Sequence, residues 1–475
     1  MKLDWRFHEY NEFEYTRPPS VWIAVAITVL VCVAGFVLTV LTWEKGQPVV
    51  SAPFLIRALL APLAVSGFAC GLLYADHEDT TEDVDIWNFL RARGRVRWQA
   101  WSQGCVAILE SVTFTPEKDL AERMLGLEGS EPRNEGKMLP LRADTQTDAL
   151  ERGEGVVLSG ERLEGVLEKI VMPFVPYMER FAAGHTFSII LQSEDETAID
   201  ALRALVRKLN VPGAGRIEIE RAEAPLDMGL VHRWLNDVKM PDFCLALACQ
   251  LHQDGQEARY SEATVGMLLA PEHVISQYGD KLKVQAYLFQ PVSAAADSVT
   301  PALRGMLKAQ RLPPEYVQHV WLGGLPKQAR HAAKAAAGGA GLAAAVHDVD
   351  LAIGVAGPAS ALLAQALAAE MVQHGQGTQL VATSGGAGIL LNLAGTQAVP
   401  VPAEPTFELR SLRPVRIVGF ACMGALLGFT LYLTKAPGGV YVLVPGFVGV
   451  ATLVDALCAQ GRYNWAENVF YGRDS

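Results

Sequence analysis

Basic residues are scarce in this chain of 475 residues: 40 lysines and arginines stand against 51 aspartates and glutamates, giving a formal net charge of −11. A general nucleic-acid binder needs a basic face that neutralises phosphates. The composition therefore argues against nucleic acid as a partner.

Cysteine is also sparse, and its spacing shows no disulfide framework. Four of the seven cysteines lie in long apolar runs, and the other three are Cys105, Cys244 and Cys249. An odd number of cysteines without framework spacing indicates reduced core thiols in a cytoplasmic compartment. We therefore expect free thiols and no disulfide bonds.

Several motifs of catalysis and cofactor binding are missing as well. The chain lacks the G-x-S-x-G, H-E-x-x-H and G-x-x-x-x-G-K-S/T patterns. Ser384–Gly386 is glycine-rich but lies between two expected strands, where a simple turn explains it. His347, Asp348 and Asp350 have side chains that can bind a metal, although a polar loop is the favoured interpretation. We expect no metal and no cofactor.

Against these absences stand four long apolar runs, arranged as one pair near each end of the chain. They cover residues 18–43, 53–75, 417–434 and 438–458. A helix needs roughly 20 mainly apolar residues to cross a bilayer. Buried helices of a soluble protein are the alternative, but paired runs with tryptophan or tyrosine near their ends favour two transmembrane hairpins.

The positive charges near these runs predict their orientation. Arg91–Arg97 holds four arginines after the second run, Arg410–Arg416 holds three before the third, and each hairpin turn holds one lysine. The positive-inside rule then predicts a multi-pass inner (cytoplasmic) membrane protein whose N-terminus, main domain and tail are cytoplasmic. Asp455 lies inside the fourth run, and the only other charged residue within the four runs is Arg57 in the second. We therefore expect Asp455 near the membrane interface.

These patterns divide the chain into seven segments. In chain order they are a cytosolic N-terminal segment (1–19), a transmembrane hairpin (20–75), a juxtamembrane linker (76–97), a cytosolic α/β domain (98–400), a linker (401–415), a second transmembrane hairpin (416–459) and a cytosolic tail (460–475).

The middle of the chain alternates short apolar strands with helices. Strands are expected at 107–113, 186–192, 216–220, 243–249, 264–269, 283–289, 317–322, 378–383 and 388–394. Helices are expected at 116–127, 163–180, 198–209, 226–238, 299–309, 327–345 and 358–373, with an exposed loop at 128–155 and a strand-like LAIG at 351–354. This alternation predicts a layered α/β domain of two strand–helix halves.

In the order of its strands and helices and in its short sequence motifs, this middle region resembles the thiolase-like fold of β-ketoacyl synthases over roughly residues 106–393. Residues 260–269 are similar to the family's strand entry P-G-E-G-A-A-A-L-L-L, and residues 353–360 to its helix start I-G-H-x-x-A-A-A-G. Residues 385–388 and the following ILLNL are similar to its closing glycine turn and strand. The resemblance implies the layered thiolase-like fold for the whole middle domain.

The same resemblance implies where catalytic groups would lie, and this sequence departs at each place. The nucleophilic cysteine would fall in the turn Arg221–Leu226, which holds no thiol and no hydroxyl. One catalytic histidine aligns with Val355, and the other falls near Gly323 and Gly324. The resemblance therefore implies a pseudo-enzyme without catalytic residues.

We therefore expect a membrane-anchored, catalytically inactive docking or scaffold protein. Its expected partners are the lipid bilayer and proteins of a membrane machine, such as a bacterial secretion machine that it serves as an accessory. Homo-oligomerisation is left open. The alternative is a membrane-associated enzyme that transfers acyl groups on lipid or acyl-carrier substrates, which requires a reactive thiol. A transporter or channel is the least favoured class, because Asp455 is a lone intramembrane acid.

Overall fold

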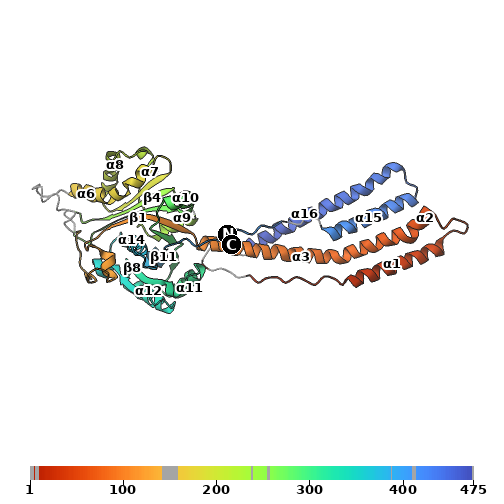
Figure 1. The fold of residues 1–475 in the computed structure, drawn as a ribbon, viewed down its shortest axis with the longest axis horizontal. Helices are drawn as coiled ribbons and strands as arrows, with labels where there is room; N and C mark the ends of the chain where they lie inside the picture. Colours follow the sequence, from red (N-terminus) through yellow and green to blue (C-terminus); the bar gives the residue numbers. More distant parts are fainter. Residues whose placement is uncertain are drawn as a thin grey trace, which may run out of the picture. The chain divides into compact units, whose positions relative to one another are not determined.

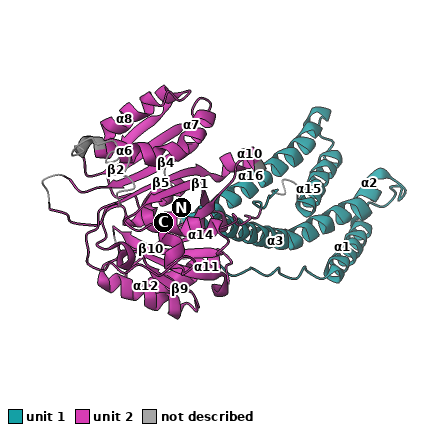
Figure 2. Cartoon of the chain, turned by 60° about the vertical axis from the view of Figure 1, so that its left-hand side comes forward, with its two compact units in different colours: residues 1–97, 403–475 teal, residues 98–402 magenta. Residues whose placement is uncertain are grey.

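The chain forms two compact units in a computed structural model. The structure describes residue 5 and residues 10–141, 159–236, 239–253, 257–386, 388–408 and 413–472. Unit 1 comprises Met1–Arg97 and Ala403–Ser475, and unit 2 comprises Trp98–Pro402 (Figure 2). Each unit is described below by itself.

Unit 1 contains four helical stretches that are long and apolar enough to cross a membrane, counted among the described residues. They are α1 (Val21–Thr42); α2 (Ala52–Leu55), η1 (Ile56–Leu60) and α3 (Ala61–Ser102) in succession; α15 (Pro414–Leu433); and η7 (Gly438–Val442) followed by α16 (Leu443–Gly472) (Figure 1). Leu30 and Leu41 on α1 are 70% and 77% exposed, so this helix presents large apolar side chains on its surface. The expected apolar hairpins are confirmed as helices, and residues 76–97 continue α3 without a break.

Small residues allow the helices of unit 1 to approach closely. A Cβ added at Gly71 of α3 would lie 2.9 Å from the Cα of Gly419 on α15. One helical turn earlier, a Cβ at Gly67 would lie 2.6 Å from the Sγ of Cys422. Helices pack in membranes through such small-residue contacts, because lipid provides no hydrophobic force between them. The N-terminal and C-terminal hairpins therefore meet along α3 and α15.

Charged side chains join three helices of unit 1 in what we call the arginine–acid cluster. The cluster consists of Arg413, Arg416, Arg462, Asp79, Glu82 and Asp455. Asp455 is buried and pairs with Arg413 at 3.2 Å and with Arg416. The expectation that only Arg57 accompanies Asp455 was therefore wrong. Its partners lie just before and in the first turn of α15, where sequence separation hid them.

Unit 2 is built on one mixed sheet of eleven strands among its described residues. The strands are β1 (Cys105–Phe114), β2 (Phe187–Ser193), β3 (Glu218–Arg221), β4 (Phe243–Gln250), β5 (Ala263–Pro271), β6 (Ala286–Phe289), β7 (Val292–Ala294), β8 (Val317–Gly323), β9 (Ala345–Asp348), β10 (Thr378–Gly385) and β11 (Gly388–Gly395). Their order is β3-β2-β4-β5-β1-β6-β11-β10-β8-β9, with β7 also paired to β11.

The sheet order contains an internal repeat. In the first half, β2 pairs in parallel with β3 and β4, and β4 pairs antiparallel with β5. In the second half, β8 pairs in parallel with β9 and β10, and β10 pairs antiparallel with β11. The strands β1 and β6 join the halves. β1 pairs with β5 of the first half, β6 pairs with β11 of the second, and β1 and β6 pair with each other. The two expected strand–helix halves are confirmed.

The helices of the first half cover the two faces of its strands. On β4, Leu245 and Leu247 pack with α6 (Ser159–Val171), α7 (Val175–Phe181), α8 (Ala198–Lys208) and α10 (Glu272–Tyr278). The alternate residues Ala246 and Ala248 pack in a separate core with α4 (Leu120–Met124), α9 (Met228–Asn236) and α14 (Ser360–Gln373). The side-chain period of two in a strand places these sets on opposite faces.

Helix α14 lies between the strands of the two halves (Figure 1). It contacts β1 and β5 of the first half and β8, β10 and β11 of the second. Its sequence SALLAQALAAEMVQ is apolar almost all round, as a helix covered on every side requires. On the second half, α11 (Val299–Ala309) contacts β7 and α12 (Lys327–Gly339) contacts β11. Unit 2 is therefore a layered α/β structure.

Two local expectations were wrong, and one falls only partly on described residues. The segment LAIG belongs to a helix, α13 (Val349–Ile353), because a short apolar run cannot distinguish a helical turn from a strand. The helix expected at 327–345 ends at Gly339, and β9 follows after Gly341, whose φ is 84°. The loop expected at 128–155 has no helix or strand through residue 141, and residues 142–155 lie outside the described part of the chain.

Candidate functional site

A cavity of about 1140 Å³ lies where corresponding turns of the two halves meet, and we call it the central cavity. It is bordered by the end of β3 and the start of α9 in the first half. In the second half it is bordered by the turn after β8, the start of α14 and the turn after β10. A cavity of this size, formed by turns at strand and helix ends, is the usual form of a ligand or active site in an α/β protein.

The structure brings together most of the turns that the sequence resemblance singled out. The whole turn Arg221–Leu226 lines the central cavity, and so does Gly324. Val355 does not line it, whereas the nearby Gly357, Pro358 and Ser360 do. Residues of distant sequence position thus border one space, which the sequence alone could not show.

Buried side chains hold these turns in place. Asp350 accepts hydrogen bonds from the backbone N–H of Gly324 at 3.0 and 3.1 Å and pairs with Arg330 at 2.9 Å. Burial nevertheless raises the pKa of Asp350 to about 6. Gln250 accepts a hydrogen bond from the backbone N–H of Ala359 at 2.8 Å. Both contacts fix a loop backbone, so these polar groups position the cavity wall.

The start of α9 carries polar groups that the sequence analysis did not single out. Asp227 accepts a hydrogen bond from the N–H of Gly229 at 2.7 Å, and partial burial raises the pKa of Asp227. His232 lines the cavity one turn later, and Gln290 lies 3.0 Å from its Nδ1 atom. A lone histidine and a lone aspartate on a helix are weak sequence signals, so only their shared cavity reveals them.

The hydroxyl groups at the cavity differ in exposure. Ser360 is buried, and its Oγ accepts a hydrogen bond from the backbone N–H of Gly357 at 3.1 Å. Ser384 is exposed and lies in β10, where it pairs with Ile389 of β11. Of Ser384–Gly386, only Gly386 lies in the turn, because Ser384 and Gly385 still belong to β10. All three residues contribute to the cavity wall.

The three thiols of unit 2 are buried away from this wall. Burial raises the pKa of Cys105, Cys244 and Cys249 to about 12 in each case. None of the three is among the described residues that line the central cavity. A thiol with so high a pKa is almost fully protonated at neutral pH and is a poor nucleophile or metal ligand.

The residues weighed as a metal site in the sequence are held by other partners. Asp348 pairs with Arg330 at 3.4 Å and with Lys334 at 3.5 Å. His347 shares a hydrogen bond of 3.0 Å with His319, and burial lowers the pKa of His347 to about 4. His347 and Asp348 thus lie at the end of β9 and Asp350 lies in α13, whereas a polar loop was expected, and each of the three side chains has a protein partner.

Solved structures with similar arrangements are ketosynthases and thiolases. An oxazolomycin ketosynthase domain of Streptomyces albus has a TM-score of 0.43 and 11% identity, covering 64% of this chain and 100% of that chain. Human mitochondrial 3-ketoacyl-CoA thiolase in complex with CoA has a TM-score of 0.37 and 8% identity, covering 62% and 98%. The 3-oxoacyl-[acyl-carrier-protein] synthase III of Aquifex aeolicus has a TM-score of 0.36 and 11% identity, covering 61% and 100%.

No family model matches the sequence, and no curated protein matches it either. The solved neighbours are thiolase-like proteins, the group that the sequence motifs resemble. Unit 2 has a mixed α/β sheet, and four long apolar helices flank it in the sequence.

Proposed function

We propose that this chain is a membrane-anchored, catalytically inactive thiolase-like protein that docks a protein partner at its central cavity. The observation that carries the proposal is the pairing of a large cavity with the absence of cysteine among the described residues lining it. An accessory role in a membrane machine, such as a bacterial secretion machine, is the setting we propose for this docking.

The chemistry of the cavity supports binding over acyl transfer. Covalent acyl transfer needs an attacking atom activated by a base or by a lowered pKa. The available thiols have raised pKa values and lie in the core. The cavity wall offers Glu220 at the end of β3 and Glu223 in the following turn, whose negative charges disfavour the formation of a thiolate or an enolate nearby.

The shape and lining of the cavity suit a peptide segment of a partner. The wall combines apolar residues such as Pro225 and Leu230 with charges of both signs, including Glu223 and Arg233. Protein-binding pockets typically combine an apolar floor with a few polar groups that orient the bound segment. The helices of unit 1 would tether unit 2 to a membrane, and we propose the inner membrane with unit 2 in the cytoplasm.

The arginine–acid cluster supports anchoring over transport. Asp455 pairs with two arginines, so its charge is already compensated. A transport site would need an acid that can exchange its partner with a substrate ion or a proton. We therefore propose that the four helices tether unit 2 and do not conduct a solute.

Site-specific photo-crosslinking in cells tests the docking surface. A photoreactive amino acid at Ala224, on the exposed cavity turn, should capture one defined protein. The same group at Ala335, exposed on α12, is the matched control and should not capture it. The captured protein, once purified, should bind the wild-type chain and bind the Ala224→Arg variant at least about 10-fold more weakly, with Ala335→Arg unchanged.

The alternative function, an acyl-transferring enzyme, predicts that an acyl group becomes attached to this protein, whereas the docking proposal predicts that none does. The cavity is large enough for an acyl group, which is the observation that favours this alternative. Full-length protein in detergent, incubated with acyl thioesters, should show no added acyl mass by intact-mass spectrometry. An acyl adduct on any residue, or equal crosslinking at Ala224 and Ala335, would reject the docking proposal.

A further inference from the structure

A histidine and two glutamates meet at the C-terminal end of α14, and we call them the carboxylate–histidine triad. Glu370 on α14 and His374 just after it are four residues apart, so they share a helix face. Glu122 comes from α4, and its Oε1 lies 3.7 Å from the Nε2 of His374. One ligand atom from each of the three residues lies within 4.8 Å of the others.

In the described part of the chain, no ion pair joins a lysine or an arginine to Glu122 or Glu370. Among the described residues, the only ion pair that either forms is the contact between Glu122 and His374. Carboxylate oxygens of Glu122 and Glu370 lie within 4.8 Å of each other, and both residues are partly buried. Like charges held together in a partly buried place are unfavourable, and a bound cation would relieve that repulsion.

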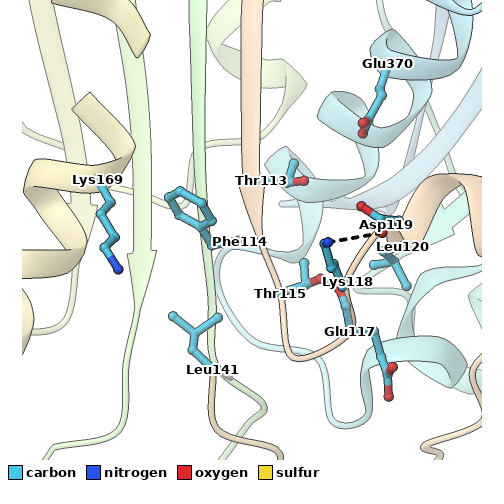
Figure 3. Close-up of a pocket in the computed structure, with 10 residues that line it drawn as sticks. All are labelled: Thr113, Phe114, Thr115, Glu117, Lys118, Asp119, Leu120, Leu141, Lys169 and Glu370. Atoms are coloured by element: carbon cyan, nitrogen blue, oxygen red, sulfur yellow. Dashed lines mark hydrogen bonds and ion pairs between the residues drawn. The ribbon is translucent and has the colours of Figure 1, made fainter. Parts of the chain in front are cut away.

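A second cavity of about 360 Å³ adjoins the triad. Its wall includes Glu370, Asp119 and Thr113, and Figure 3 shows the carboxylate of Glu370 pointing towards the other two. Of the three triad residues, Glu370 lines this cavity, which gives the Glu370 side of the site room for the waters that complete the coordination of an ion. None of the triad residues lines the central cavity, so this inference does not rest on the proposed function.

The elements that carry the triad are rigidly supported. Most of α14 is buried between the two halves of unit 2, and α4 packs directly on it. The ring of His347 lies beside the backbone of Met124, the last residue of α4. A nitrogen of the same ring meets His319 at 3.0 Å. Sites on such elements keep their ligand geometry better than sites on loops.

We propose that Glu122, Glu370 and His374 bind a divalent transition-metal ion of the Zn²⁺ class, with water in the remaining positions. An imidazole nitrogen with two carboxylates suits Zn²⁺ and its neighbours, whereas Ca²⁺ and Mg²⁺ prefer oxygen ligands alone. The ion would tie α4 to the end of α14 and so link the segment after β1 to the central helix.

Calorimetric titration of the metal-free, full-length protein in detergent with ZnCl₂ tests the site. The wild type should bind one Zn²⁺ that is lost in the triad variants. Glu370→Gln and His374→Gln should each weaken this binding by more than the roughly 10- to 100-fold that loss of an outer-shell partner costs. His331→Gln, at an exposed histidine on α12, is the matched control and should bind like the wild type.

A thermal melt separates loss of the site from loss of the fold. Without metal, Glu370→Gln should be at least as stable as the wild type, because it removes a repelled carboxylate. Added Zn²⁺ should raise the melting temperature of the wild type and of His331→Gln, but not that of Glu370→Gln. Two results would overturn the proposal and leave a triad that only shares a proton. One is that the wild type shows no saturable Zn²⁺ binding. The other is that Glu370→Gln and His374→Gln bind Zn²⁺ as tightly as the wild type does.

Discussion

The guanidinium of Arg413 lies 3.2 Å from the carboxylate of Asp455, and the side chains of both residues are more than nine-tenths buried. Arg413 immediately precedes α15, whereas Asp455 lies within α16. Arg413 also meets Asp79 of α3 at 2.9 Å. One arginine therefore joins the N-terminal and C-terminal hairpins, which makes the arginine–acid cluster the main polar contact between them.

Removing Arg413 should strongly destabilise unit 1. The change Arg413→Met leaves Asp455 and Glu82 buried with less compensation, and breaking a buried ion pair typically costs about 3–5 kcal/mol. Asp83→Asn is the control, since the side chain of Asp83 is 58% exposed and its pair with Arg462 should contribute within about 1 kcal/mol. For each variant, the melting temperature in detergent and the amount of protein recovered from size-exclusion chromatography are compared with those of the wild type. Equal melting temperatures for wild type and Arg413→Met would contradict this role of the cluster.

The orientation of the chain is a prediction from the arginines beside α3 and α15. Reporter domains placed in the loop at 128–155 and after the tail should be active only if the reporter works in the cytoplasm. A reporter in the turn between α1 and α2, near Gly46, should behave in the opposite way, and this position serves as the internal control. Periplasmic activity of the reporter in the loop would reverse the topology.

The core thiols should be unreactive in the folded protein. Because burial raises the pKa of Cys244 and Cys249 to about 12, the thiolate fraction at pH 8 is about 10⁻⁴ for each. A water-soluble thiol reagent should label neither residue at pH 8 until denaturant unfolds unit 2, as peptide mass spectrometry can measure. Rapid labelling of either cysteine in the folded state would instead favour the acyl-transfer enzyme.

Stability should fall as pH rises through the range set by Glu370. The pKa of Glu370 is about 7 in the folded state against an ordinary value of 4.5 for a glutamate, so the unfolded chain releases its proton first. Between those values the folded state binds more protons, and the free energy of unfolding therefore decreases as pH increases. Denaturant unfolding of metal-free protein at pH 5, 6 and 7.5 should show this decrease. Glu370→Gln should reduce the slope, and an unchanged slope would show that other groups cause it.

Local patterns in the chain were enough to predict most elements of the fold. The apolar runs predicted the four helices that are long and apolar enough to cross a membrane, because a bilayer demands one long stretch of apolar residues. The strands around Phe243 and Val317 and the helix from Pro358 were found because period and composition report burial within a few residues. The same local signals failed for LAIG, whose four residues are too few to show a period.

Contacts between residues far apart in the chain depend on the three-dimensional packing. The charge of Asp455 is readable in the sequence, but its pairing with Arg413 and Arg416 depends on how α15 and α16 cross. The central cavity exists because the internal repeat brings the turn at Ala224 against Gly324 and Ser360. No local pattern links residues so distant along the chain.

The carboxylate–histidine triad shows the same division. The spacing of Glu370 and His374 on one helix face follows from the helical period alone. Glu122 joins them only because α4 packs against α14, which buries its carboxylate near a second one. The sequence therefore determines which side chains can ionise, bind a ligand or enter a membrane. Packing determines which of these side chains meet, and the energy of interaction between two charges becomes large only when they are close together and buried.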